Sequence, residues 1–393
     1  MSRVSKTGTC VERSSIRVFL EKQNKIAESC GDMISFTIGE PDFLTPPNIV
    51  EAAKKALTEG KVKYAPNAGL LELREAVSRD LFRTHGVHYD PEKEIVITPS
   101  GMETLRLAAM AILDDDDEMI VNDPCWANHP NHSKMAHGKP VMVPVHEKNN
   151  FFYDLEELET YLTPKTKAIL LNTPNNPTGA VMSQEELCGF CDFCKKHDLI
   201  VISDEVYYNI IFDGLKFCSP AMVEGMKERV IISQSFSKTY AMTGWRLAFA
   251  AGPADIMEAM GRLNENSISC VNTFVQWAGI EALEGTREHI DAMVTEFQNR
   301  RDIIYEGINA IDGLSCVKPR GAFYAFVNIQ GTGLSSEEFA TRLLEEKHVG
   351  LVPGTGFGAS GEGFVRISYA TSTENIREGI RRIGEFVKEL KNE

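Results

Sequence analysis

Apolar residues recur with two different spacings along the chain, one typical of strands and the other typical of helices. Short, β-rich apolar runs stand at seven places: 94–98, 119–122, 140–145, 168–172, 199–204, 230–233 and 246–251. Segments with helical spacing lie between these runs. This alternation predicts an α/β fold, with a mostly parallel, seven-stranded sheet between two layers of helices.

The two ends of the chain follow other patterns. Ser14 and Ser15 are expected to cap an amphipathic helix that reaches about Cys30, and Pro47 is expected in the first turn of a helix that ends near Gly60. The C-terminal part combines a long helix, two strands and a closing helix, expected at 287–310, 322–327, 364–368 and from about 373.

These patterns predict a division of the chain into three parts. We expect an N-terminal arm and helix that join the small domain, a large cofactor-binding domain, and a smaller α+β domain, over 1–45, 46–285 and 286–393. The length of 393 residues fits two domains, because single cores stop growing near about 250–300 residues.

Composition and charge narrow the range of functions that the protein is expected to have. The net charge of -15 opposes general binding to nucleic acid or to an anionic membrane, since both reward clustered Lys and Arg. Nine cysteines, an odd number, fit reduced thiols better than a disulfide framework. The N-terminus lacks the apolar core of a signal peptide and no long apolar segment follows, so we expect a cytoplasmic protein without a membrane span. The acidic run 114–117 is interpreted as a solvated turn.

Three polar side chains follow predicted strands, where open parallel sheets bind ligands. Lys238 lies among small and hydroxyl residues, where desolvation lowers the pKa of an amine and allows it to condense with an aldehyde. Asp204 precedes Tyr207 by three residues, and such a carboxylate can keep a pyridine nitrogen protonated. Asn176 lies in a rigid turn. Taken singly, each also fits a structural role: a surface lysine, a helix cap or a plain turn.

Two further segments suit a planar, anionic ligand. Gly101 and Met102 open a helix after a strand, where free N–H groups and the helix dipole attract an anion. Trp126 follows another strand and is able either to stack on a ring or to pack in the core.

Taken in order, these segments resemble the class I aminotransferases of the aspartate aminotransferase family, which are fold type I enzymes that use pyridoxal 5′-phosphate (PLP). The resemblance runs from Ile38-Gly-Glu-Pro-Asp-Phe43 to Phe364-Val-Arg-Ile-Ser-Tyr-Ala370. It is carried by the ordered set Tyr64-Ala-Pro-Asn-Ala-Gly69, Asn-Asn-Pro-Thr-Gly, Ser-Asp-Glu-Val-Tyr, Ser-Phe-Ser-Lys and Thr-Gly-Trp-Arg.

The resemblance implies a role for each matching residue. Lys238 is the Schiff-base lysine and the proton carrier, Asp204 lies under the pyridine nitrogen, and Asn176 and Tyr207 bind the ring hydroxyl. Stacking and phosphate binding are implied for Trp126, Ser235 and Arg246, with the backbone of Gly101 and Met102.

The resemblance also implies how substrate and a second subunit are used. Arg366 is expected to bind the substrate α-carboxylate with a guanidinium fork, near the backbone of Gly39 and the side chains of Asn176 and Trp126. Tyr64 is expected to reach the phosphate of the neighbouring subunit, which requires a homodimer.

The implied reaction is the transfer of an amino group from an L-amino acid to a 2-oxo acid, with 2-oxoglutarate as the expected acceptor, by a ping-pong mechanism. Aspartate-specific members bind the second carboxylate with a lysine, where this chain has Met102, or with an arginine in a stretch whose counterpart here, 263–276, contains no Arg or Lys. Arg17 is a candidate substitute. We therefore expect a broad donor range that includes aromatic side chains.

Other interpretations remain open at this point. A PLP-dependent carbon–sulfur β-lyase shares the same cofactor residues, and a non-catalytic PLP-binding regulatory module would carry a basic DNA-binding segment, which is absent. Cys188, Cys191 and Cys194 have the spacing of a metal motif, but the capping-box sequence at Ser183 makes them an apolar helix stripe, and no metal is expected. His129 is interpreted as at most a substrate-side neighbour of Trp126.

Overall fold

The computed structural model describes residues 3–11, 13 and 15–393. The expected helix cap at Ser14 lies outside these residues. The first helices are α1 (Lys6–Cys10), α2 (Ser15–Cys30) and α3 (Pro47–Thr58).

The central sheet has seven strands: β2 (Ile95–Thr98), β3 (Glu118–Asp123), β4 (Lys139–Pro144), β5 (Thr166–Asn172), β6 (Ile200–Asp204), β7 (Val230–Ser235) and β8 (Ala248–Ala251). Their order in space is β2-β8-β7-β6-β5-β3-β4, and only β8 runs antiparallel to its neighbours. The mostly parallel sheet is thus confirmed. In register, Asn172 pairs with Asp204 and Asp204 pairs with Ser233, so the carboxyl ends of β5, β6 and β7 lie side by side.

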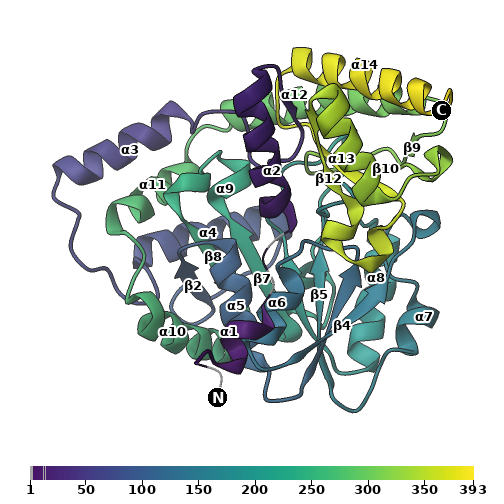
Figure 1. Ribbon diagram of the computed structural model, residues 1–393. Helices are drawn as coiled ribbons and strands as arrows, with labels where there is room; N and C mark the ends of the chain where they lie inside the picture. Colours follow the sequence, from purple (N-terminus) through teal and green to yellow (C-terminus); the bar gives the residue numbers. More distant parts are fainter. Residues whose placement is uncertain (1–2, 12, 14) are drawn as a thin grey trace.

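Helices cover both faces of this sheet because successive strand residues point in opposite directions. In β3, Ile120 packs into the core under α4 (Leu71–His85), α8 (Gln184–Lys196) and α11 (Thr273–Glu284). Its neighbours Met119 and Val121 pack into the opposite core, under α5 (Gly101–Ile112) and α10 (Ala254–Ile268). Figure 1 shows the two layers, and α6 (His129–Met135), α7 (Leu155–Glu159) and α9 (Phe236–Thr239) complete this part.

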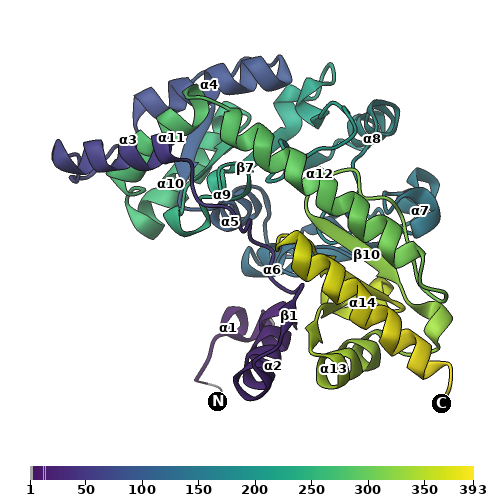
Figure 2. The same ribbon diagram turned by 90° about the horizontal axis from the view of Figure 1, so that it is seen from above.

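A second, antiparallel sheet has the order β12 (Val352–Pro353), β13 (Phe364–Ser368), β10 (Tyr324–Asn328) and β9 (Ser315–Cys316). It packs with α12 (Glu288–Asn309), α13 (Ser336–Lys347) and α14 (Thr373–Leu390), which lie together in Figures 1 and 2. Helix α2 joins this core: Phe19 is buried in it, and Lys22 pairs with Glu345 of α13 at 3.1 Å. A short parallel pair, β1 (Ile34–Ser35) with β11 (Val349–Gly350), adds to it.

Backbone conformation and helix capping decide where several strands and helices begin. The strands expected from residues 246 and 322 begin two residues later, because Arg246 and Ala322 have left-handed backbones with φ of 60° and 57°. The side chain of Ser183 forms the predicted capping box with Glu186, and Cys191 and Cys194 lie buried on the core face of α8.

The acidic turn 114–117 lies at the surface and forms ion pairs with Lys139, Lys165 and Lys167. Among the described residues, no helix is both long enough and apolar enough to cross a membrane.

Candidate active site

A cavity of about 550 Å³ opens at the carboxyl ends of β5, β6 and β7, facing the second sheet. It contains eleven of the twelve residues to which the resemblance gives a cofactor-binding or substrate-binding role: Gly39, Gly101, Met102, Trp126, Asn176, Asp204, Tyr207, Ser235, Lys238, Arg246 and Arg366. The strand register explains this gathering, because the ends of three neighbouring strands meet at one edge of the sheet.

Lys238 lies in the short helix α9, directly after β7, and its amine points into the cavity. Burial lowers the pKa of this amine to about 8; Glu40 opposes the effect, while Arg366 and Arg246 add to it. The Nζ atom donates a hydrogen bond of 2.6 Å to the carbonyl oxygen of Gly39. A substantial fraction of such an amine is neutral near pH 8, which is the state that attacks an aldehyde or accepts a proton.

Asp204 ends β6 and lines the cavity, and its carboxylate contacts His129, which is not among the lining residues. The distance between His129 Nε2 and Asp204 Oδ2 is 3.0 Å, and the histidine is fully buried. The interpretation of His129 as at most a substrate-side neighbour of Trp126 is wrong. His129 is the first residue of α6, which packs on β3 and β4, so its ring meets Trp126 edge to face at 5.3 Å and reaches Asp204.

Arg366 lies on β13 of the second sheet, is 1 % exposed, and is held in place by several groups. Its guanidinium donates to the Thr37 carbonyl oxygen at 2.6 Å and to Asn176 Oδ1 at 3.1 Å. The rings of Tyr324 and Phe357 lie 4.6 and 4.8 Å from its Cζ atom. Burial lowers the pKa of Arg366, whereas Tyr324 and Tyr207 oppose that shift. A buried guanidinium without a carboxylate partner among the described residues is well suited to bind an anionic ligand group.

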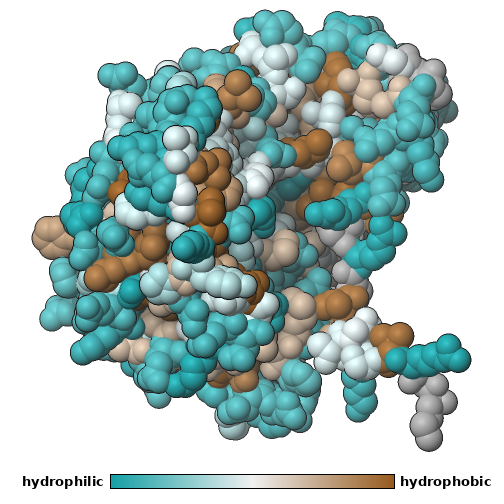
Figure 3. Space-filling view, turned by 90° about the vertical axis from the view of Figure 1, so that its left-hand side faces the viewer, coloured by the Kyte–Doolittle hydropathy of each residue, from teal (hydrophilic) through white to brown (hydrophobic). Residues whose placement is uncertain are grey.

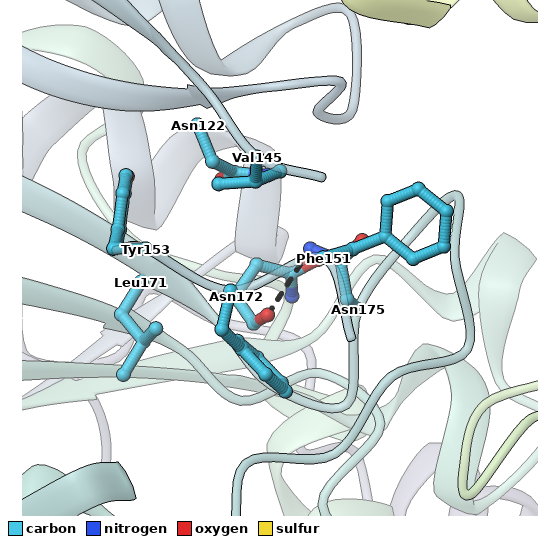
Figure 4. A pocket seen from close by; sticks show the side chains of 8 residues that line it. Asn122, Val145, Phe151, Tyr153, Leu171, Asn172 and Asn175 are labelled. Carbon is cyan, nitrogen blue, oxygen red and sulfur yellow. Dashed lines mark hydrogen bonds between the residues drawn. The ribbon is translucent and has the colours of Figure 1, made fainter. Parts of the chain in front are cut away.

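Asn176 is positioned by a network of amides. Asn172 donates to the Asp204 carbonyl oxygen at 2.9 Å and accepts from the Asn176 backbone N–H at 2.9 Å. Asn175 donates to the Asn172 carbonyl oxygen at 3.2 Å, beside a second cavity of about 10 Å³ (Figure 4). That space suits at most a single water, so it is a packing feature of the turn.

An anion site occupies one end of the larger cavity. Ser100 caps α5 by accepting a hydrogen bond from Glu103 N at 3.1 Å, which leaves the N–H groups of Gly101 and Met102 without intrahelical acceptors. Arg246 lines the same cavity, and its Nη1 donates to the Thr243 carbonyl oxygen at 2.8 Å. The helix dipole and the guanidinium together favour a group with negative charge.

Tyr64 is the predicted site residue that the structure does not bring to the cavity. It is 90 % exposed and lies in the connection between α3 and α4. Leu44 and Val62 are also exposed, at 93 % and 61 %. The space-filling view shows hydrophobic residues on one side of the molecule, among hydrophilic ones (Figure 3).

Several lining residues were not predicted from sequence. Tyr324 contacts both Tyr207 and Arg366, yet a tyrosine within an apolar strand resembles any core aromatic. Ser237 lies one residue before Lys238 and lines the cavity, so its proximity in sequence was a usable signal. Ile16 enters from α2, next to Arg17, which the sequence analysis named as a candidate for the second carboxylate.

Comparisons with known proteins show the family to which the chain is similar. The family described as aminotransferase class I and II matches residues 31–383. An aromatic-amino-acid aminotransferase 2 of Thermococcus litoralis and an aspartate aminotransferase of Pyrococcus abyssi are each 43% identical over 374 residues, covering 95% of this chain and 96% of each relative.

Solved structures show the same similarity. The aromatic aminotransferase of Pyrococcus horikoshii is 42% identical, with a TM-score of 0.90 over 94% of this chain and 99% of that one. The aspartate aminotransferase of Thermus thermophilus with maleate is 36% identical, with a TM-score of 0.93 over 98% of this chain and 100% of that one.

Proposed function

Because the chain belongs to the class I and II aminotransferase family and is an amino-acid aminotransferase of fold type I, we propose that it binds PLP in the 550 Å³ cavity. The observation that carries the proposal is the gathering of a buried lysine, a carboxylate and an anion site around one space. The volume lies within the range of about 300–1,000 Å³ that is usual for small-molecule sites.

The residues present fit the cofactor. The N-terminus of α5, with Ser235 and Arg246, would hold the phosphate, and Asp204 would face the pyridine nitrogen. Trp126 would lie against the ring, with Asn176 and Tyr207 on its hydroxyl. When bound, PLP supplies an aldehyde and an electron-withdrawing ring that stabilises negative charge at the substrate Cα.

The protein's own groups carry out the remaining tasks. Arg366 binds the substrate α-carboxylate and thereby orients the Cα proton toward Lys238. The Lys238 amine accepts that proton, because its pKa of about 8 leaves it largely neutral in mildly alkaline solution. His129 holds the carboxylate of Asp204 in one orientation opposite the ring.

The division of the chain supports a closing motion as part of the proposal. In this proposal 286–393 form a small domain that α2 joins, and 46–285 form the large domain, on which α1 rests through Cys10 and Lys134. Arg366 and Lys238 then lie on opposite sides of the boundary. Closure of the small domain over the substrate would exclude water from the reacting atoms. We also place the enzyme in the cytoplasm, in keeping with its nine cysteines.

A homodimer with shared sites accounts for the exposed aromatic and aliphatic residues. Tyr64, Leu44 and Val62 would be covered by the second subunit, and Tyr64 would reach the partner's phosphate site. Mixing Tyr64→Phe chains with Lys238→Ala chains should produce hybrid dimers with one site free of both changes, and so more activity than either parent. A fully active monomer in sedimentation would refute this arrangement.

The substrates are proposed from the lining of the cavity mouth. Ile16 and Met102 offer apolar contacts for aromatic or aliphatic side chains, and Arg17 adds a cation within reach of a second carboxylate. The donor is therefore an L-amino acid of broad type, with aspartate and aromatic amino acids included, and 2-oxoglutarate is the acceptor.

The test is direct. Protein loaded with PLP should absorb in the visible, and its spectrum should change with amino acids and return with 2-oxo acids. Lys238→Ala should abolish turnover, whereas Lys165→Ala, at an exposed turn, should not. Turnover that survives in Lys238→Ala would refute the proposed mechanism.

A further inference from the structure

Tyr324 is a buried residue that contacts three groups of the site, although no sequence pattern pointed to it. Its hydroxyl lies 2.8 Å from the hydroxyl of Tyr207, and its ring lies 4.6 Å from the Cζ atom of Arg366. A Cβ atom on Gly39 would stand 2.3 Å from the Tyr324 hydroxyl, so only glycine fits there. The hydroxyl and the ring of Tyr324 thus meet different functional groups.

The strand register explains how these contacts arise. Arg366 pairs with Phe326 across β13 and β10, and Tyr324 lies two residues before Phe326, so Tyr324 and Arg366 share one face of the sheet as diagonal neighbours. Tyr207 follows β6 of the other sheet. The bond between the two hydroxyls therefore joins the two halves of the site.

Electrostatics couples this bond to Arg366. Each phenol carries one proton, so one hydroxyl donates and the other accepts. Burial raises the pKa of Tyr324, and Arg366 partly offsets this effect by stabilising the phenolate. Burial raises the pKa of Tyr207 well above its usual value, Tyr324 and Asp204 raise it further, and Arg366 again opposes the shift. The charge of Arg366 therefore acts on both phenols of the hydrogen-bonded pair.

We propose that Tyr324 is a positioning residue that links carboxylate binding at Arg366 to the hydrogen bond that Tyr207 presents to the cofactor. The inference rests on the proposed function. A carboxylate on Arg366 reduces the positive potential at Tyr324, alters the hydrogen bond between the two hydroxyls, and so changes the bond made by Tyr207. Arg366 also donates to Asn176, so Tyr324 carries one of two parallel links.

The experiment follows the pH midpoint of the visible absorbance of the PLP-loaded enzyme, with and without maleate. Maleate carries carboxylates and has no amino group to transfer, so it reports binding alone. Other charged groups near the phenols are Asp204, after β6, and Lys238, whose amine is held by Gly39. We expect maleate to shift the midpoint of the unmodified enzyme.

Two variants separate the hydroxyl from the ring. Tyr324→Phe keeps the ring beside Arg366 and should reduce the maleate-dependent shift by about half, with about a fivefold loss in kcat and little change in KM. Tyr324→Leu also removes the ring and should weaken maleate binding to the protein without PLP by about fivefold, measured by calorimetry.

Tyr369→Phe is the matched control. Tyr369 is a buried tyrosine of the same core, its hydroxyl donates to the Ala322 carbonyl oxygen at 3.3 Å, and it does not line the cavity. Its loss of one hydroxyl should leave both the midpoint and the shift unchanged. Tyr207→Phe removes the other partner and should reduce the shift as Tyr324→Phe does, which provides a second route if one variant is unstable.

The outcomes are distinct. A maleate-dependent shift in Tyr324→Phe equal to that of the unmodified enzyme would overturn the link. An unmodified enzyme that gains no visible absorbance with PLP would instead refute the proposed function, whatever the variants do.

Discussion

The Nε2 atom of His129 lies 3.0 Å from Oδ2 of Asp204, and the histidine ring has no exposure to solvent. The ring also meets the indole of Trp126 edge to face. The carboxylate at the end of β6 is therefore oriented by a residue of α6 that has no contact with the cavity itself.

Substitution of Asp204 and substitution of His129 should both slow the reaction, but by different amounts. Asp204→Ala removes the charge opposite the ring nitrogen and should reduce the rate of the amino-acid half-reaction by about a thousandfold or more, roughly 4 kcal/mol. His129→Leu keeps the charge and loses only its orientation, so about a tenfold loss is expected. Stopped-flow absorbance measures both rates. Equal losses in the two variants would contradict the separate roles.

A second prediction concerns pH and the lysine. The pKa of Lys238 is about 8 in the folded protein, below its value of roughly 10.4 in an unfolded chain. The unfolded chain therefore binds more protons between these two values, and the contribution of Lys238 to the free energy of unfolding rises with pH across this window.

The measurement compares urea unfolding of the PLP-free protein at several pH values from about 7 to about 10 with that of Lys238→Met. The difference between the two proteins should change with pH in the stated direction, while Lys165→Met should show no such change. A difference that is constant with pH would mean that the lysine titrates normally.

The apolar runs of the sequence predicted the strands, and the informative motifs stand directly after those strands. Asn176, Asp204 and Lys238 each follow an apolar strand, and the parallel register alone brings them together. The contacts of His129 and Tyr324 depend on packing between distant elements. A histidine at a helix start or a tyrosine in an apolar strand carries no local signal that distinguishes such a partner from ordinary core packing.

The adjacent carboxylates Asp204 and Glu205 are a second case in which the sequence alone does not show the contacts of a residue. Asp204 lines the cavity, whereas Glu205 is fully buried and contacts His85 Nε2 at 2.8 Å. Glu205 also accepts from Ser203, Ser219 and Gln234, at 2.9, 2.5 and 3.0 Å. Burial alone would raise the pKa of Glu205, but His85, Ser219 and Gln234 lower it overall.

Loss of the Glu205 charge should therefore reduce the stability of the fold rather than the catalytic activity. Glu205→Leu leaves His85 and three further donors without their acceptor and should reduce the free energy of unfolding by about 3–5 kcal/mol. Glu284→Leu, at an exposed carboxylate paired with Arg79, should change it by less than about 1 kcal/mol. Urea unfolding decides the matter, and a Glu205→Leu protein as stable as the control would show that the network is dispensable.

The last prediction concerns Arg17 and the choice of substrate. Arg17 is exposed on α2 and lines the cavity, where the other cations are engaged: Arg366 with Asn176, Arg246 with Thr243 and Lys238 with Gly39. An exposed arginine remains solvated when an aromatic side chain occupies the site, so it imposes no penalty on apolar substrates. It can still pair with the second carboxylate of aspartate or 2-oxoglutarate.

Arg17→Met should therefore reduce kcat/KM for aspartate and for 2-oxoglutarate by about tenfold, which corresponds to about 1.4 kcal/mol and suits a partly exposed charged pair. The value for phenylalanine should stay within about twofold, since no charge is lost from its contacts. Arg13→Met is the matched control, because Arg13 is exposed, pairs with Glu21 at 2.6 Å, and does not line the cavity. Steady-state kinetics with the three substrates measures the effect. A uniform loss for all three in Arg17→Met would indicate that Arg17 supports α2 instead of binding the second carboxylate.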